Sequence, residues 1–358
     1  MFNLLKSYFL RNKTIFICAL GFLCLEYFQL SNLYSGATIV AGGDSYIHLL
    51  LGKYGLYPYA WDNSIPFGST NYNIANLLGF QLYSEVFKGI PAAYIQRGMF
   101  FVLYLLKFVA FTKLTTLFAK NLSVLALFPA LLIYSYSAFA SLSPIAYFPL
   151  MYGIYLPFSI YYFIKLVDSP KISLVNIAKL LILSIIFSPI NSNLALSVTI
   201  FIPQLVYLLV NFKKINYLAI FNLVFYGLGF VLVNLWWFIP FLQFFLNSAS
   251  AVLNGGSWFQ ATAAGYLFQN FRFMGQWGWY GGHFLHLYYP FSSYYDNPII
   301  IIVSYALVIF AFYESMQTDS NKVVYKHKTF LFALTLIALF LISGSRYPLG
   351  FFYKFLFD

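Results

Sequence analysis

One acidic side chain lies where it could do chemistry at a membrane surface. Asp44 follows a Gly-Gly pair and opens a short helical pattern that Gly55 and Pro58 close. A carboxylate at such a helix start could take a proton from an attacking hydroxyl group. The alternative is that Asp44 caps the helix beginning at Ser45. Both roles are compatible, because the positive end of the helix dipole keeps a carboxylate ionised.

Arginine side chains are the next candidates, because a guanidinium binds phosphate through two parallel hydrogen bonds. Arg97 stands at the predicted external end of an apolar segment, where the positive-inside tendency disfavours a cation. The alternative for Arg97 is snorkelling of its charged end to the interface. The same argument applies more weakly to Arg272 and Arg346. Lys53 either pairs with Asp44, touches phosphate or lies on a solvated helix face.

Histidine and tryptophan side chains in a glycine-rich stretch complete the candidate set. His283 and His286 could share a helix face, but no third metal ligand accompanies them. A polar contact in a sugar pocket, or a plain loop position, is therefore favoured over metal binding for both. Trp258, Trp277 and Trp279 could stack on sugar rings or lie at the membrane interface.

The acids near Asp44 do not form a typical metal site. Asp62 is expected to form an Asx turn, and the sequence has no Asp-x-Asp pair. A divalent ion that holds a diphosphate normally needs two or more oxygen ligands. A donor ligand with one phosphate is therefore favoured over one with two. No cofactor is expected. A divalent metal stays open as the less favoured alternative, because Asp62 or Asp296 could approach Asp44 in space.

Composition predicts that the scaffold around these residues is a polytopic membrane protein of the all-α class. Of the 358 residues, 61% are hydrophobic and only 8% are charged, whereas soluble domains carry about 25% charged residues. The net charge of +11 does not indicate nucleic-acid binding, because the basic residues are dispersed over loops. Membrane lipids are the expected surroundings.

Long apolar segments predict about nine membrane-spanning helices. The segments lie at about 14–34, 97–119, 122–142, 145–165, 172–187, 194–211, 217–246, 298–314 and 327–344. The protein is expected in the plasma membrane. Lys6, Arg11 and Lys13 precede the first segment, so the positive-inside rule predicts a cytoplasmic N-terminus. A further apolar helix at about 73–87 is predicted not to cross, because crossing would move the later lysine groups outside.

We expect the whole chain, 1–358, to form a single transmembrane domain. Residues 35–96 would form a large first external loop with two helices lying along the membrane, and residues 247–297 a second external loop. No internal repeat or low-complexity tract suggests a different organisation. The apolar aromatic pattern still continues at Asp358, which is either a natural end or the end of a truncated reading frame.

Several motifs occur in a characteristic order along the chain. A first span leads to Gly43-Asp44, two membrane-lying helices and a Tyr72-Asn73 turn, followed by Ile90-Pro91-Ala92-Ala93-Tyr94-Ile95-Gln96-Arg97, Leu235-Trp236-Trp237-Phe238-Ile239-Pro240 and Tyr347-Pro348-Leu349-Gly350. This order resembles that of the polytopic GT-C glycosyltransferases, in particular the alpha-arabinofuranosyltransferase group of cell-wall synthesis. The resemblance covers most of the chain, which departs from the larger members of the group in having neither their C-terminal extracellular domains nor their additional spans.

The resemblance implies a cell-envelope enzyme that moves a sugar from a polyprenyl-phosphate donor to an extracytoplasmic glycan, lipid or protein acceptor. It implies that Asp44 is the catalytic base of an inverting displacement and that arginines stabilise the charge developing on the phosphate. Two alternatives stay open. One is a flippase for lipid-linked saccharides, which would normally show repeated halves and broken helices. The other is a non-catalytic membrane scaffold of the same fold.

Overall fold

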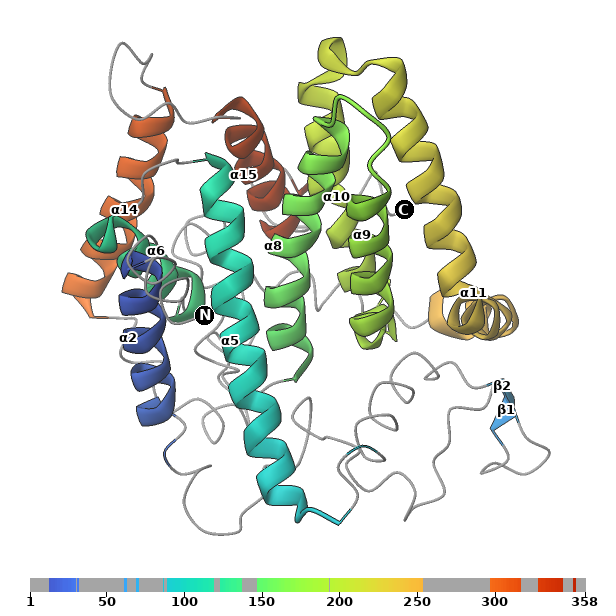
Figure 1. Ribbon diagram of the computed structural model, residues 1–358, viewed down its shortest axis with the longest axis horizontal. Helices are drawn as coiled ribbons and strands as arrows, with labels where there is room; N and C mark the ends of the chain where they lie inside the picture. Colours follow the sequence, from blue (N-terminus) through green and yellow to red (C-terminus); the bar gives the residue numbers. More distant parts are fainter. Residues whose placement is uncertain are drawn as a thin grey trace, which may run out of the picture. The chain divides into compact units, whose positions relative to one another are not determined.

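Helices make up nearly all of the secondary structure in this computed structural model (Figure 1). The structure describes residues 13–29, 31, 61–62, 69–70, 86, 89–118, 123–136, 147–192, 194–253, 297–316, 328–343 and 350–351. For these residues the all-α class predicted from composition is confirmed, apart from one two-residue β pairing. In that pairing Trp61 of β1 (Trp61–Asp62) lies opposite Thr70 of β2 (Ser69–Thr70). The backbone of Asp62, where an Asx turn is predicted, belongs to β1, and the residues that would complete that turn lie outside the described ones. Most of the helix predicted at 73–87 lies outside them as well.

The described helices fall in the apolar segments that the sequence singles out. They are α2 (Lys13–Gln29), α5 (Ala92–Phe118), α6 (Val124–Tyr136), α8 (Tyr147–Val167), α9 (Leu174–Ile186), α10 (Leu194–Val210), α11 (Tyr217–Leu253), α14 (Pro298–Met316) and α15 (Lys328–Ser343), with short 3-10 turns η3 (Ser188–Ser192) and η4 (Phe212–Lys214). Among the described residues, three stretches are long and apolar enough to cross a membrane by length and composition. These are Ala93–Phe118, Leu150–Val167 and Tyr217–Gln243. The structure is thus that of a membrane-associated helical protein.

The chain divides into two units by its internal contacts. The first unit comprises Met1–Leu131 and Ile145–Ala249, and the second comprises Leu132–Pro144 and Ser250–Asp358. The first unit contains α2, α5, α8, α9, α10 and most of α11. In the second unit α14 and α15 pack through an edge-to-face pair of Phe312 and Phe332, with ring centroids 5.8 Å apart.

Several helices begin at a polar side chain that accepts a hydrogen bond from the first turn. Ser123 before α6 accepts a backbone N–H at 3.2 Å, and Asn216 before α11 and Asn297 before α14 each accept one at 2.9 Å. Serine and asparagine are preferred at this position because their oxygens satisfy N–H groups that have no partner within the helix. Pro298 then occupies the first position of α14, where its missing N–H costs nothing.

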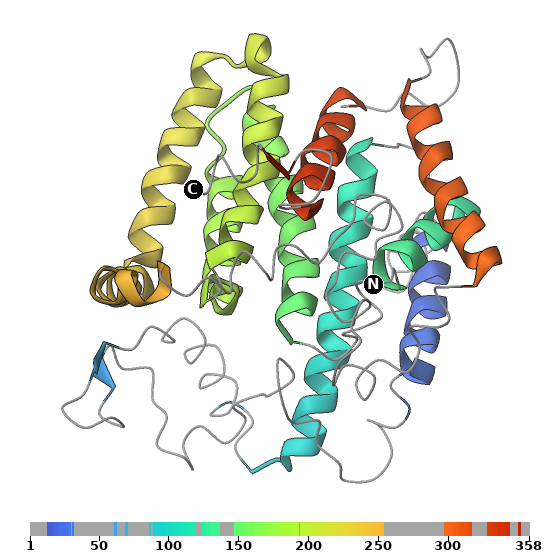
Figure 2. The same ribbon diagram turned by 180° about the vertical axis from the view of Figure 1, so that it is seen from behind.

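Helices of the first unit run in opposite directions, so their connections lie at two opposite ends. These two ends differ in their basic residues. Figures 1 and 2 show α5, α8 and α10 running one way and α9 and α11 running the other way. One end, the lysine end, holds Lys165, Lys171 and Lys213, which lie near or in the α8–α9 and α10–α11 connections. The opposite end holds the start of α5 and the 187–193 connection, which has no lysine or arginine. We call it the Arg97 end.

Proline occurs inside four described helices without ending them. The residues are Pro129, Pro157, Pro203 and Pro240. Proline removes one backbone hydrogen bond, but membrane helices tolerate it where neighbouring helices satisfy the freed groups. The helix α11 continues through Pro240 to Leu253 and changes direction in its C-terminal half (Figure 1).

Candidate functional site

Arg97 is the predicted site residue whose side chain the structure describes. The others lie outside the described residues: Asp44, Lys53, Trp258, Arg272, Trp277, His283, His286 and Arg346. The site geometry is therefore built from Arg97 and from the polar residues of the helices around it.

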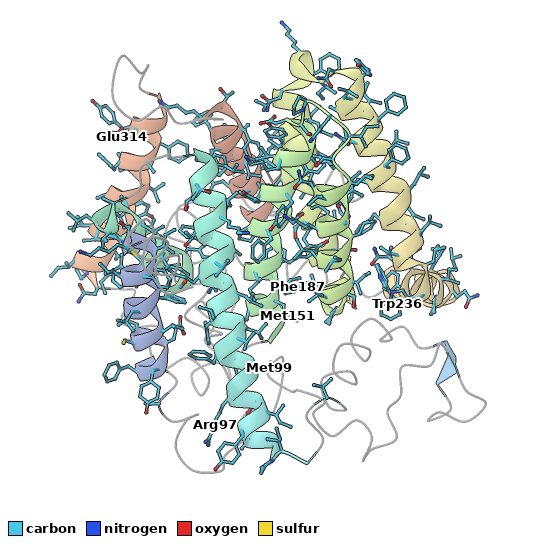
Figure 3. The ribbon with its side chains drawn as sticks, in the orientation of Figure 1. Arg97, Met99, Met151, Phe187, Trp236 and Glu314 are labelled. Atoms are coloured by element: carbon cyan, nitrogen blue, oxygen red, sulfur yellow. The ribbon has the colours of Figure 1, made fainter. Side chains whose placement is uncertain are left out.

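Arg97 lies in the second turn of α5 at the Arg97 end of the first unit (Figure 3). The preceding chain turns at Gly89, whose φ of +92° is a conformation that favours glycine. The carbonyl of Pro91 then accepts the N–H groups of Tyr94 at 2.9 Å and Ile95 at 3.3 Å, which starts the helix. This local geometry, with the helix beginning at Ala92, places Arg97 near the helix end but inside it.

The guanidinium of Arg97 is oriented by an aromatic ring on the preceding turn. Its central carbon lies 5.3 Å from the ring centroid of Tyr94, within the range of a cation–π contact. The Arg97 side chain is half-buried, whereas Tyr94 is exposed. A cation–π contact restricts the orientation of the guanidinium. Arg97 is therefore an oriented cation at the edge of the helical unit, which is the property that phosphate binding needs.

A second set of polar groups runs along α5 from Gln96, next to Arg97, to Lys107 near the middle of the helix, and was not predicted from the sequence. Gln96, Tyr104 and Lys107 are all buried, and their spacing of eight and three residues places them on one face of the helix. Glu26 on α2 is buried as well, and its carboxylate interacts electrostatically with the ammonium of Lys107. The two charged residues are only 4% and 7% exposed.

Aromatic packing holds α2 against α5 beside this charge pair. The rings of Phe22 and Phe108 lie 6.0 Å apart at centroid and are both fully or almost fully buried. Lys107 lies about 22 Å along α5 from its first residue, so the pair is far from the helix start. Ionisable side chains within apolar helices are costly and commonly mark a functional pathway or a binding site.

A sequence signal for the charge pair existed, but it was incomplete. Glu26 is the acid within the first apolar segment, and Lys107 lies inside the segment predicted at 97–119. Each residue lies near the middle of its predicted segment, where a charge is costly, but neither residue alone shows which side chain is its partner. The pairing becomes visible only once α2 and α5 are known to be neighbours.

Two buried asparagines on α11 have the opposite character, because neutral groups satisfy them. The side-chain oxygen of Asn222 accepts the backbone N–H of Ser173 at 2.9 Å, and its amide nitrogen donates to the carbonyls of Leu166 and Lys171, each at 3.2 Å. These bonds tie the α8–α9 connection to α11. Asn222 therefore has a structural role.

Asn234 makes the second set of these bonds, near the middle of α11. Its amide nitrogen donates to Ser184 Oγ at 3.2 Å and to the carbonyl of Phe230 at 2.8 Å, and its oxygen accepts from Trp237 Nε1 at 2.7 Å. Trp237 is buried and packs against Trp236 and Phe241. The Asn-Leu-Trp-Trp motif thus fixes α11 to α9.

Within the part of the chain that the structure describes, no group of three or more histidine, cysteine, aspartate or glutamate residues could hold a metal ion. The prediction about metal dependence rests on the first external loop, which this finding does not reach. Compared with known proteins, the chain matches no protein-family model, and neither the curated proteins nor the solved structures show a significant similarity to it.

Proposed function

We propose that the protein is a membrane glycosyltransferase of the GT-C type that uses a polyprenyl-phosphate sugar donor. The observation that carries the proposal is the oriented, half-buried guanidinium of Arg97 at the end of the first unit opposite the lysine end. A cation held at that place suits the phosphate of a lipid carrier. The sequence motifs around Asp44 supply the candidate base.

The distribution of lysines supports the orientation in this proposal. Lysine is concentrated in cytoplasmic connections of membrane proteins, and the lysine end contains Lys165, Lys171 and Lys213. The lysine end then faces the cytoplasm, and the Arg97 end faces the outside. In the proposed topology the chain crosses the plasma membrane about nine times, starting from a cytoplasmic N-terminus, and the active site is extracytoplasmic.

The proposed reaction is a single inverting displacement. Asp44 takes the proton of an acceptor hydroxyl, and the oxygen of that hydroxyl attacks the anomeric carbon of the donor sugar. The bond between the anomeric carbon and the phosphate oxygen breaks, and the electron pair stays on the lipid phosphate. Arg97 compensates the charge that develops there.

The remaining candidate residues have supporting roles in this proposal. Lys53, Arg272 and Arg346 are further phosphate-binding candidates. Contacts to the donor sugar or to the glycan, lipid or protein acceptor fall to the aromatic and histidine residues of the second external loop: Trp258, Trp277, His283 and His286.

The test is sugar transfer in membranes from cells that express the protein, supplied with radiolabelled polyprenyl-phosphate sugars. We expect transfer by wild type, none by Asp44→Asn at equal expression, and a reduction of at least tenfold in Arg97→Ala. Arg97→Lys keeps the charge but loses the two-point phosphate contact, so it should fall between wild type and Arg97→Ala. Lys165→Gln at the lysine end is the control and should transfer as wild type does. Absence of wild-type transfer from every donor would contradict the proposal.

A specific observation favours a second candidate, a flippase for lipid-linked saccharides. Buried opposite charges within apolar helices, such as Glu26 and Lys107, are typical of transport pathways. The test is movement of a fluorescent polyprenyl-phosphate sugar across the bilayer of proteoliposomes, read by its accessibility to a membrane-impermeant quencher. Movement by wild type that Glu26→Gln/Lys107→Gln abolishes, together with no sugar transfer, would favour the flippase. If the protein shows neither sugar transfer nor movement of the lipid-linked sugar, the non-catalytic scaffold is the remaining alternative.

A further inference from the structure

We propose that Lys113 and Lys179 bind the headgroup of an anionic phospholipid in the cytoplasmic leaflet, with Tyr162 between them. This site lies at the lysine end of the first unit and does not depend on the proposed enzymatic activity. It is built from three helices, because Lys113 belongs to α5, Tyr162 to α8 and Lys179 to α9.

Both ammonium groups approach the same buried tyrosine. Lys113 Nζ donates a hydrogen bond to the Tyr162 hydroxyl at 3.3 Å and lies 5.7 Å from the ring centroid. Lys179 Nζ lies 5.1 Å from the same centroid. Tyr162 also packs edge to face against Tyr161, with ring centroids 5.0 Å apart. Tyr162 thus contacts both lysine side chains, whereas Tyr161 contacts Lys113 only.

No carboxylate neutralises these two lysines among the residues that the structure describes. Their contacts are the Tyr162 hydroxyl and the rings of Tyr161 and Tyr162. The nearby Asp168, at the end of α8, accepts a hydrogen bond from the Tyr207 hydroxyl instead. The two ammonium groups are at most about 11 Å apart and repel each other. An anion shared between them would relieve that repulsion.

The depth of the two lysines matches the level of lipid phosphates. Lys113 lies five residues before the end of α5 and Lys179 five residues after the start of α9, so both are about 7 Å inside the helix ends. Lysine at this depth extends its charged end to the interface, and tyrosine is enriched there. Basic groups between helices on the cytoplasmic side are suited to anionic lipid headgroups.

An exposed apolar stripe continues from Lys179 towards the middle of the membrane. Ile182 and Ile186 follow Lys179 at spacings of three and seven residues, so they lie on the same face of α9. They are 53% and 56% exposed. An acyl chain can lie along this stripe while the phosphate contacts the lysines. This combination favours a phospholipid over a soluble anion.

The test is native mass spectrometry of the full chain in detergent, titrated with phosphatidylglycerol or phosphatidylcholine. We expect wild type to retain phosphatidylglycerol at least tenfold more tightly than phosphatidylcholine. Lys113→Gln/Lys179→Gln should lose this preference, and Lys113→Arg/Lys179→Arg should keep it. The control, Lys171→Gln/Lys213→Gln, removes the same charge from exposed positions at the same end and should behave as wild type.

Three results would overturn the proposal. Equal retention of phosphatidylglycerol by Lys113→Gln/Lys179→Gln and wild type would show that these lysines only extend to the interface. An equal loss in the control would show a general surface-charge effect. The third is an increase in the unfolding midpoint caused by inorganic phosphate as large as that caused by phosphatidylglycerol, which would identify a soluble anion as the occupant. The arginine variant separates loss of binding from loss of folding.

Discussion

The contacts between α2 and α5 differ in kind from those between α8, α9 and α11. In the first region a buried glutamate and a buried lysine interact, whereas in the second region Asn222 and Asn234 form hydrogen bonds with neutral partners. Desolvating two charges costs more than desolvating an amide. The second region shows that neutral groups are enough to fix helices in this chain. The charge pair of Glu26 and Lys107 therefore calls for a functional reason beyond packing.

The largest expected effect comes from breaking the charge pair on one side only. Glu26→Gln leaves Lys107 buried without its counter-charge, and such changes cost about 3–5 kcal/mol in the free energy of unfolding. Glu26→Gln/Lys107→Gln removes both charges and should recover more than half of that loss. The measurement is unfolding in mixed micelles followed by tryptophan fluorescence. A single variant that loses less than about 1 kcal/mol, or a double variant that loses the sum of both single variants, would show that the two charges are not coupled.

Removing Asn222 should have the next largest effect. Asn222→Leu replaces the amide by an apolar side chain of similar size, which leaves the N–H of Ser173 and the carbonyl of Leu166 without their side-chain partner. An unsatisfied buried polar group costs about 1–3 kcal/mol. The same unfolding measurement applies, with the exposed Val224→Ala on α11 as the control. If Asn222→Leu unfolds as the control does, α11 is held to the α8–α9 connection by packing and not by these hydrogen bonds.

Trp237→Phe should have a smaller effect because it removes a single donor. The Nε1–H of Trp237 binds Asn234 at 2.7 Å, and one such hydrogen bond contributes about 1 kcal/mol. Combined with Asn234→Ala, the substitution forms a double-mutant cycle, for which we expect a coupling of about 0.5–1.5 kcal/mol. A coupling near zero would mean that the ring of Trp237 and not its N–H holds this part of α11.

The sequence predicted the positions of the helices well because apolar segments of this length have few other structures available in a membrane. The boundaries were less accurate. α5 begins at Ala92, before the predicted start at 97, because the Pro91 carbonyl accepts the first N–H groups. α11 continues to Leu253, beyond the predicted end at 246 and into the predicted second external loop, because Pro240 does not end the helix.

The polar contacts between helices could not be predicted from the sequence. Arg97 stands out in the sequence by its place at a predicted external helix end, which is a local feature. Glu26 and Lys107 are 81 positions apart, and Asn222 binds residues of a connection about 50 positions earlier. Each of these contacts depends on which helices become neighbours. Hydropathy and charge counts contain no information about that choice.

The smallest expected effect tests how closely α9 and α11 pack beside Asn234. A methyl group added at Gly229 would lie 2.9 Å from Leu181 Cδ1, whereas one added at Gly227 has no atom within 4 Å. Alanine is favoured over glycine inside a helix by about 1 kcal/mol, so Gly227→Ala should raise the unfolding midpoint. Gly229→Ala should raise it less or leave it unchanged, because the end of the Leu181 side chain must move. Equal increases would mean that Leu181 moves freely, and that the hydrogen bond between Asn234 and Ser184, rather than close packing, fixes α9 to α11 at this level.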